Sequence, residues 1–191
     1  MKAKRDVRNN LLPAWMGGQL RTGLGQALLS KGLDVTGRET RGEFKDFSFT
    51  DQVQVVSEDL LNHFWTSNSL LIANSFGAYL FLHAQAKLMP YPGKVLLLSP
   101  IVGGFSDEKT GRSFSPPHEH KLSEIAEAGY FPRLSQCEVH TGEDDWQSHP
   151  ISVRKFFNAL DVVVNIVPSR GHQLGEDYVG PLLDRWLATK N

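Results

Sequence analysis

Residues 70–80 read Leu-Leu-Ile-Ala-Asn-Ser-Phe-Gly-Ala-Tyr-Leu, and the pattern turns from a buried strand into an amphipathic helix at Ser75. Such a turn is typical of a nucleophile elbow, which lifts a serine hydroxyl above the end of a parallel sheet. Strand and helix nearly touch there, so small residues are needed two positions before and after the serine. Ala73 and Gly77 fill these positions, and Ala73 is a mild departure from the usual glycine. The alternative is a serine that only caps a helix.

Strand-like and helix-like segments alternate along the rest of the chain. Short strand-like segments predict strands at 33–35, 69–74, 94–99, 137–141 and 162–167, and a weaker pattern, polar in its middle, predicts a first strand at 6–12. Apolar residues at helical spacing predict helices at 20–29, at 51–64 with Asp51 as N-cap, and at 75–87, 120–128, 151–160 and 175–189. Polar residues at 36–50 predict a loop. This alternation predicts an α/β fold, a three-layer sandwich around a central parallel sheet of about six strands.

Length and composition favour a soluble protein with one domain over 1–191. The formal net charge of −1 gives no sign of a nucleic-acid or acidic-membrane partner. The basic start around Lys2 is not followed by an apolar stretch, so no secretory signal is expected. No segment is long and apolar enough to predict a membrane span. Cys137 is the only cysteine and cannot form an internal disulfide, which favours a cytoplasmic location.

Chemically useful side chains follow three of the predicted strands, at the sheet edge where ligands of such folds bind. Ser75 follows one strand, an acidic run at 143–145 follows another, and His172 follows the last. A serine needs a base to take its proton, a histidine can serve as that base, and a carboxylate can hold the imidazole. Each residue alone has an ordinary explanation, as a helix cap, a solvated turn or a loop histidine. Their joint occurrence, in the order used by α/β-hydrolases, predicts a Ser-His-Asp site.

The residues alone do not decide which of Glu143, Asp144 and Asp145 reaches the far nitrogen of the histidine. An oxyanion hole needs two N–H donors where negative charge develops. We expect one from the backbone of Phe76, directly after the serine, and the other from the backbone of Trp15 in the loop after the first strand.

With these motifs in place, the chain resembles the α/β-hydrolase superfamily, and within it the small serine hydrolases related to retinoblastoma-binding protein nine. The resemblance rests on the size of the chain, a Pro-x-x-x-Gly-Gly turn at 13–18, the pair Asp144-Asp145, and Gly171-His172. It implies a minimal α/β-hydrolase fold, with six parallel strands and no added antiparallel pair. It also gives the acid role to Asp145, with Asp144 as second choice.

Residues 100–132 lie where such hydrolases insert lids, and we interpret them as a short lid-like insert. The aromatic side chains of Phe105, Phe114, Tyr130 and Phe131 either line a small apolar pocket or pack this loop onto the sheet. Such an insert is too short for a large cap domain, which favours short acyl groups.

No metal or cofactor is expected. His118 and His120 alternate with a glutamate, but no third ligand follows at a recognisable spacing, so a solvated loop is the better interpretation. The glycines at 17–25 lack the spacing of a dinucleotide-binding motif. Cys137, at the start of a strand, is interpreted as a small buried hydrophobe.

The sequence therefore predicts a serine hydrolase that cleaves small esters, thioesters or amides through an acyl-enzyme on Ser75. Its activity should rise with pH as the base His172 loses its proton, near the range of roughly 6–7 usual for histidine. Two alternatives remain open. One is a hydrolase-like scaffold that binds a protein partner with little turnover, and the other is an acyltransferase with the same triad.

Overall fold

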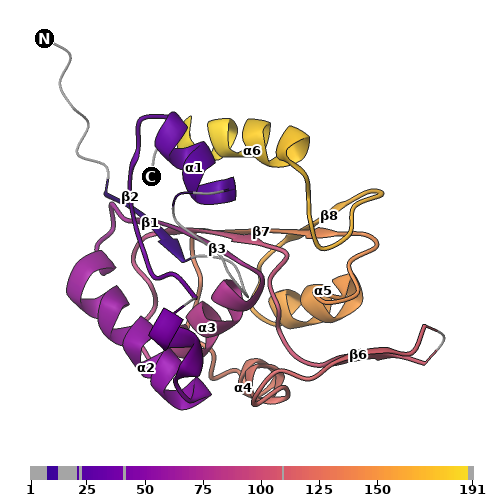
Figure 1. The fold of residues 1–191 in the computed structure, drawn as a ribbon. Coiled ribbons are helices and arrows are strands. Elements are labelled where there is room, and N and C mark those ends of the chain that lie inside the picture. The colour runs from indigo at the N-terminus through magenta and orange to yellow at the C-terminus, as the bar shows by residue number, and fades with distance from the viewer. Residues whose placement is uncertain (1–7, 13–20, 22, 41, 109, 189–191) are drawn as a thin grey trace, which may run out of the picture.

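The computed structural model describes residues 8–12, 21, 23–40, 42–108 and 110–188 (Figure 1). Its main strands are β1 Arg8–Leu12, β2 Asp34–Thr36, β3 Leu70–Asn74, β4 Lys94–Leu98, β7 Cys137–Gly142 and β8 Val164–Val167. Within the described residues these six strands form one sheet in the order β2-β1-β3-β4-β7-β8, and every neighbouring pair is parallel. The predicted central parallel sheet is confirmed.

Helices cover both faces of this sheet. They are α1 Gly23–Ser30, α2 Phe49–Asp59, α3 Ser75–Gln85, α4 Lys121–Glu127, α5 Pro150–Asn158 and α6 Glu176–Ala188. Figure 1 shows α1 and α6 on one face and α2, α3 and α5 on the other. In β3, Leu70 and Ile72 pack into the cluster under α1 and α6, whereas Leu71 and Ala73 pack into the opposite cluster. Burial on both faces explains why this strand is a continuous apolar run rather than an alternating one.

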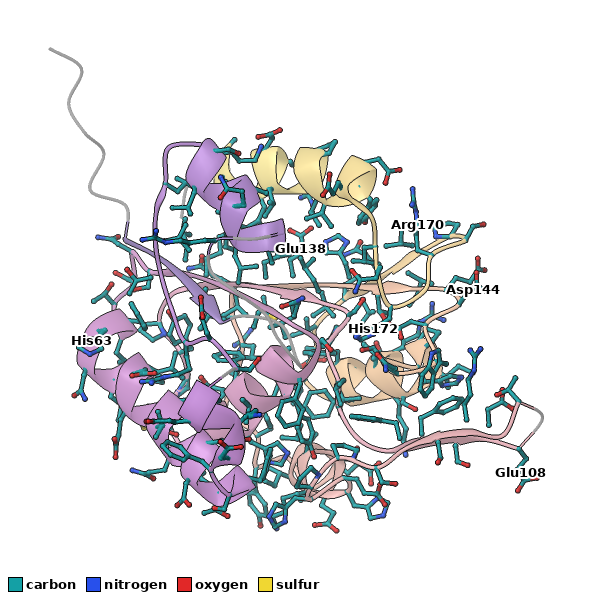
Figure 2. All side chains as sticks on the ribbon, in the orientation of Figure 1. His63, Glu108, Glu138, Asp144, Arg170 and His172 are labelled. Carbon is teal, nitrogen blue, oxygen red and sulfur yellow. The ribbon has the colours of Figure 1, made fainter. Side chains whose placement is uncertain are left out.

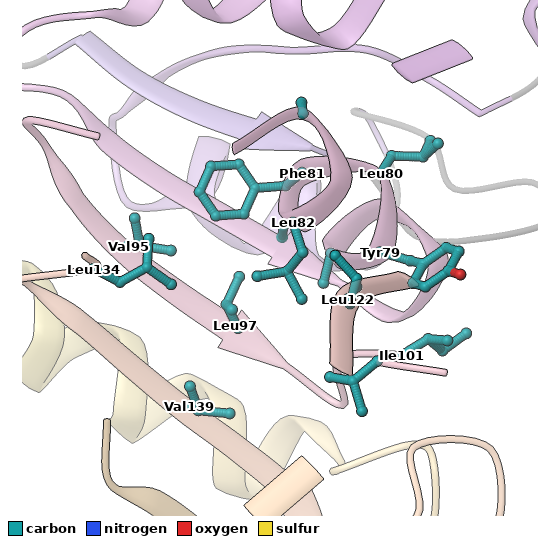
Figure 3. Close-up of a cluster of buried hydrophobic side chains, with 14 of the residues drawn as sticks. Tyr79, Leu80, Phe81, Leu82, Val95, Leu97, Ile101, Leu122, Leu134 and Val139 are labelled. Atoms are coloured by element: carbon teal, nitrogen blue, oxygen red, sulfur yellow. The ribbon is translucent and has the colours of Figure 1, made fainter. Parts of the chain in front are cut away.

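The helix α3 lies at the centre of the larger core cluster (Figure 3). Every residue from 77 to 85 is buried, so the prediction of an amphipathic helix here was wrong. The surrounding sheet and helices leave α3 no solvent-facing side, and a helix buried all round is apolar all round. Neither α3 nor any other described helix is long and apolar enough to cross a membrane.

The path of the chain places β3 beside a reversal of strand order. From β1 the chain runs outward to the edge strand β2, then returns to β3 on the other side of β1 and continues through β4, β7 and β8. The strand order therefore reverses between the neighbouring strands β1 and β3. Folds of this type bind their ligands in the crevice at such a reversal.

The segment before β3 differs from its prediction. The N-cap of α2 is Ser48, whose Oγ accepts the amide of Asp51 at 3.2 Å, so Asp51 lies inside the first turn. A short 3-10 helix, η1 Gly42–Asp46, interrupts the expected loop at 36–50. The helix α2 continues directly into one wide turn, η2 Leu60–Phe64.

The insert at 100–132 contains a β-hairpin that the sequence did not indicate. Its strands β5 Phe105–Asp107 and β6 Arg112–Phe114 pair antiparallel, and Figure 1 shows the hairpin projecting from the body of the molecule. Phe131 packs edge-on against Phe156 in the core, which favours the packing interpretation for that ring. Tyr130 is 81% exposed, so its ring neither lines a pocket nor packs the loop onto the sheet. A lid function for this insert remains a prediction.

Candidate active site

Ser75 is the first residue of α3 and directly follows β3. Its φ of +50° lies in the left-handed region, which is strained for a residue with a Cβ. This conformation is what turns the chain abruptly from strand into helix. Ala73 and Gly77, the two small residues on either side of the turn, are both buried. Ser75 itself is 5% exposed.

The histidine and one carboxylate meet this serine. Ser75 Oγ lies 2.7 Å from His172 Nε2, and His172 Nδ1 lies 3.0 Å from each carboxylate oxygen of Asp145. With the imidazole neutral, Nδ1–H donates to the carboxylate and Nε2 accepts the serine hydroxyl proton. Serine, imidazole and carboxylate thus form one continuous hydrogen-bonded chain.

The other two acidic candidates point elsewhere. Asp144 is exposed, and its backbone amide donates to the carbonyl of Arg170 at 2.8 Å. Glu143 is also exposed, and its Oε2 accepts the amide of Ser169 at 3.1 Å. Figure 2 shows Asp144 and Arg170 at the outer edge, away from the central His172. The structure therefore brings only Asp145, among these three acids, to the imidazole.

Backbone amides hold the Asp145 carboxylate in place. Its Oδ1 accepts the amides of Gln147 at 3.0 Å and Ser148 at 2.9 Å, in a tight turn of its own loop. Asp145 is only 1% exposed, so these donors replace the water that would otherwise solvate its charge.

The loop after β7 carries Asp145 and is called the acid loop, and the loop after β8 carries His172 and is called the base loop. The backbones of these two loops touch. A Cβ on Gly142 would lie 2.2 Å from the carbonyl oxygen of Arg170 and 2.3 Å from that of Gly171. Gly171 itself needs no special freedom, because a Cβ there would meet only Asp144 O at 3.9 Å and its φ is not positive. Gly142 is the glycine that permits close approach.

Of the two expected oxyanion donors, only Phe76 lies within the described residues. It belongs to the first turn of α3, and its ring packs against Phe49 and Tyr79. Trp15 lies outside the described residues.

Behind the serine, α3 carries two titratable groups in an aromatic cluster with Phe49. Burial raises the pKa of Tyr79, and its hydroxyl donates to the carbonyl of Pro117 at 2.6 Å. Burial, helped by the nearby charges of His118 and Lys87, lowers the pKa of His83 to about 4. His83 Nε2 is buried without a hydrogen-bond partner, so its neutral form suits this environment.

Two titratable residues of β7 lie outside this hydrogen-bonded chain of serine, imidazole and carboxylate. His140 bonds to Tyr178 through Nδ1 and to Glu138 through Nε2, each at 2.7 Å. Burial raises the pKa of Cys137, as expected for an unreactive thiol. Within the part of the chain that the structure describes, no group of three or more His, Cys, Asp or Glu could hold a metal ion.

Sequence reasoning missed the residues that support the acid, above all Ser148 and Thr141. Thr141 Oγ1 donates to the carbonyl of Ser148 at 3.0 Å, and both side chains are buried. A serine and a threonine near a strand end carry no distinguishing signal, because such residues are common in turns.

No family model matches the sequence, and no curated protein matches it either. Solved structures do match the fold. The hydrolase of 2-hydroxy-6-oxo-6-phenylhexa-2,4-dienoate from Rhodococcus sp. strain RHA1 is 14% identical with a TM-score of 0.66, and the match covers 95% of this chain and 91% of that one. The ydeN gene product of B. subtilis is 17% identical with a TM-score of 0.60, covering 95% and 98%. A structure from a study of carboxylesterases of the thaumarchaeon Nitrososphaera gargenis is 11% identical with a TM-score of 0.62, covering 96% and 90%.

These similarities, together with the parallel sheet and its order, establish the fold: the chain has the α/β-hydrolase fold. At this level of identity they show the fold alone. The narrower relation to hydrolases like retinoblastoma-binding protein nine remains a prediction.

Proposed function

We propose that this protein is a serine hydrolase that cleaves small esters, thioesters or amides through an acyl-enzyme on Ser75. The observation that carries the proposal is the continuous hydrogen-bonded chain from Ser75 through His172 to the buried Asp145. The hydrolases and esterases among proteins of the same fold support it.

In this mechanism, Ser75 Oγ attacks the acyl carbon while its proton passes to His172 Nε2. Asp145 keeps Nδ1 protonated and stabilises the imidazolium as it forms. The imidazolium then donates its proton to the leaving group, and the C–O, C–S or C–N bond breaks. Water repeats the sequence, with His172 as base, and releases the acid product and free Ser75. The amide of Phe76, together with that of Trp15, would hold the oxyanion, and losing one such donor usually costs about 10²- to 10³-fold in kcat.

The small-molecule substrate and the cytoplasmic setting are part of the same proposal. They rest on the short insert between β4 and β7 and on the single cysteine. No cofactor is needed, because the serine, imidazole and carboxylate supply the nucleophile, base and charge that acyl transfer requires.

The test is covalent labelling with a fluorophosphonate, followed by intact-mass analysis. We expect one adduct on the wild type and none on Ser75→Ala or His172→Ala, with each variant shown to be folded by circular dichroism. An adduct that persists in Ser75→Ala would place the reactive group elsewhere and contradict the proposal. A wild type that is folded but takes up no label would favour the alternative of a hydrolase-like scaffold that binds a protein partner. If the adduct forms but short esters turn over only when an alcohol or amine acceptor is added, the result would favour the acyltransferase alternative.

A further inference from the structure

Ser148 makes three hydrogen bonds around the acid, and none of the three is to the imidazole or to Ser75. Its amide donates to Asp145 Oδ1 at 2.9 Å, its hydroxyl donates to the carbonyl of Ser99, and its own carbonyl accepts Thr141 Oγ1 at 3.0 Å. Asp145 and Ser148 are each 1% exposed, and Thr141 is fully buried. A buried polar group that lacks a hydrogen-bond partner is costly, because water cannot replace the partner. These bonds therefore strongly favour one geometry of the acid loop.

The acceptor Ser99 belongs to a strained turn at the end of β4. Its φ of +44° is in the left-handed region, and its own hydroxyl is buried without a partner, so its side chain does not explain the conformation. The carbonyl of Ser99, in contrast, is the atom that Ser148 engages. Backbone strain of this kind persists only where the surroundings impose it, and it gathers at functional sites.

The same turn also reaches the nucleophile. The amide of Ile101, two residues after Ser99, donates to the carbonyl of Ser75 at 3.4 Å. One short segment, 99–101, therefore contacts the nucleophile turn on one side and the acid loop on the other. Ser148 is the side chain that joins this segment to the acid.

We propose that Ser148 is a positioning residue that sets the distance and angle of Asp145 relative to His172 by tying the acid loop to the turn after β4. The inference rests on the proposed hydrolase function of the same site. Without the hydroxyl, the loop keeps its amide donors and the bond from Thr141 but loses its hydrogen bond to the turn after β4. The carboxylate then holds the imidazole less firmly, and the fraction of molecules with Nδ1–H facing Asp145 falls.

The test compares Ser148→Ala with Ser57→Ala. Ser57 is also a buried serine whose hydroxyl bonds to a backbone carbonyl, that of Val53 at 2.8 Å, but both residues belong to α2 and neither is part of the serine, acid or base loop. With p-nitrophenyl acetate as substrate, we expect Ser148→Ala to lower kcat about 10- to 100-fold with KM unchanged, as for a small misplacement of a catalytic group. Ser57→Ala should leave both constants as in the wild type.

A second readout does not depend on turnover. The nitrogen NMR shifts of the His172 ring report which nitrogen carries the proton. We expect a single Nδ1–H form in the wild type and in Ser57→Ala, and a mixture of the two forms in Ser148→Ala. If Ser148→Ala does not fold, Thr141→Val removes the neighbouring hydrogen bond at nearly constant shape and should change the same two readouts.

The two proposals can fail separately. If the wild type neither labels nor hydrolyses ester, the proposed function fails, and the tautomer mixture in Ser148→Ala still decides the positioning role. If the wild type is active but Ser148→Ala matches Ser57→Ala in both kcat and ring shifts, the positioning role is overturned.

Discussion

Asp144 and Asp145 are neighbours in the chain, yet their environments are opposite. Asp145 is 1% exposed, faces His172 Nδ1 and accepts two backbone amides, whereas the side chain of Asp144 is directed to solvent. Successive side chains of a tight turn point in different directions, so one step along the chain exchanges a buried contact for an exposed position. At this scale, the acid role depends on the direction in which one side chain points.

This difference predicts unequal effects of the same substitution. Asp145→Asn places an amide against the imidazole, which stabilises the wrong tautomer. If the proposed function holds, we expect kcat to fall by about 10⁴-fold, the loss known for this change in a serine protease triad. Asp144→Asn removes the same charge from an exposed neighbour and should leave kcat nearly unchanged. Steady-state ester hydrolysis measures both. Equal losses in the two variants would contradict the assignment of the acid.

At the level of elements, the site depends on how closely the loops after β7 and β8 approach each other. The last register pair of these strands, Gly142 with Val167, continues into contacts of Glu143 and Asp144 with the base loop. Strand pairing thus extends directly into the loops that carry Asp145 and His172. This arrangement works only while the backbones remain in van der Waals contact at Gly142.

Gly142→Ala should therefore separate the two loops. The new Cβ would lie 2.2 Å from Arg170 O, a backbone atom that cannot rotate away, so the base loop must move. We expect a loss of about 1–3 kcal/mol in the free energy of unfolding, as for other overpacked sites, together with a fall in kcat. Urea denaturation and ester hydrolysis measure these effects.

Gly171→Ala is the matched control in the facing loop, where the nearest atom would be 3.9 Å from the Cβ. It should keep both stability and activity close to wild type. A Gly142→Ala variant as stable and active as Gly171→Ala would show that the loops tolerate separation.

At the scale of the whole molecule, α3 is packed into the core, and the burial of its His83 makes the free energy of unfolding depend on pH. His83, on α3, is 6% exposed, and its pKa falls from 6.5 to about 4 because burial, and then the charges of His118 and Lys87, disfavour the imidazolium. The unfolded chain binds this proton at higher pH than the folded protein does. Acid therefore favours unfolding through His83.

We expect His83 to contribute stability above about pH 6.5 that is progressively lost as the pH falls to about 4. The loss attributable to this residue is about 3 kcal/mol. His83→Gln cannot take up the proton, so its free energy of unfolding, measured by urea denaturation at several pH values, should fall less over that range. His63→Gln, at an exposed position in η2, should keep the wild-type slope. Parallel slopes for all three proteins would contradict this account.

Much of the fold could be predicted because its main signals are local. The central strands β3 and β4 are short apolar runs, most helices repeat their apolar residues at helical spacing, and the turn at Ser75 is flanked by small residues. The β5–β6 hairpin was missed because its strands are three residues each and its exposed faces impose no apolar pattern. The N-cap of α2 was misplaced because Ser48 and Asp51 are both good capping residues, and only the backbone angles distinguish them.

By itself, the sequence determined the class of fold and the order serine, acid, histidine along the chain, because apolar periodicity and residue type are properties of each segment. Only the tertiary structure decided that Asp145 faces the imidazole, that Gly142 rather than Gly171 must be small, and that Ser148 joins the acid loop to the turn after β4. These features depend on distances between loops that are far apart in the chain. Such distances are set by strand register and backbone packing, which no single segment encodes.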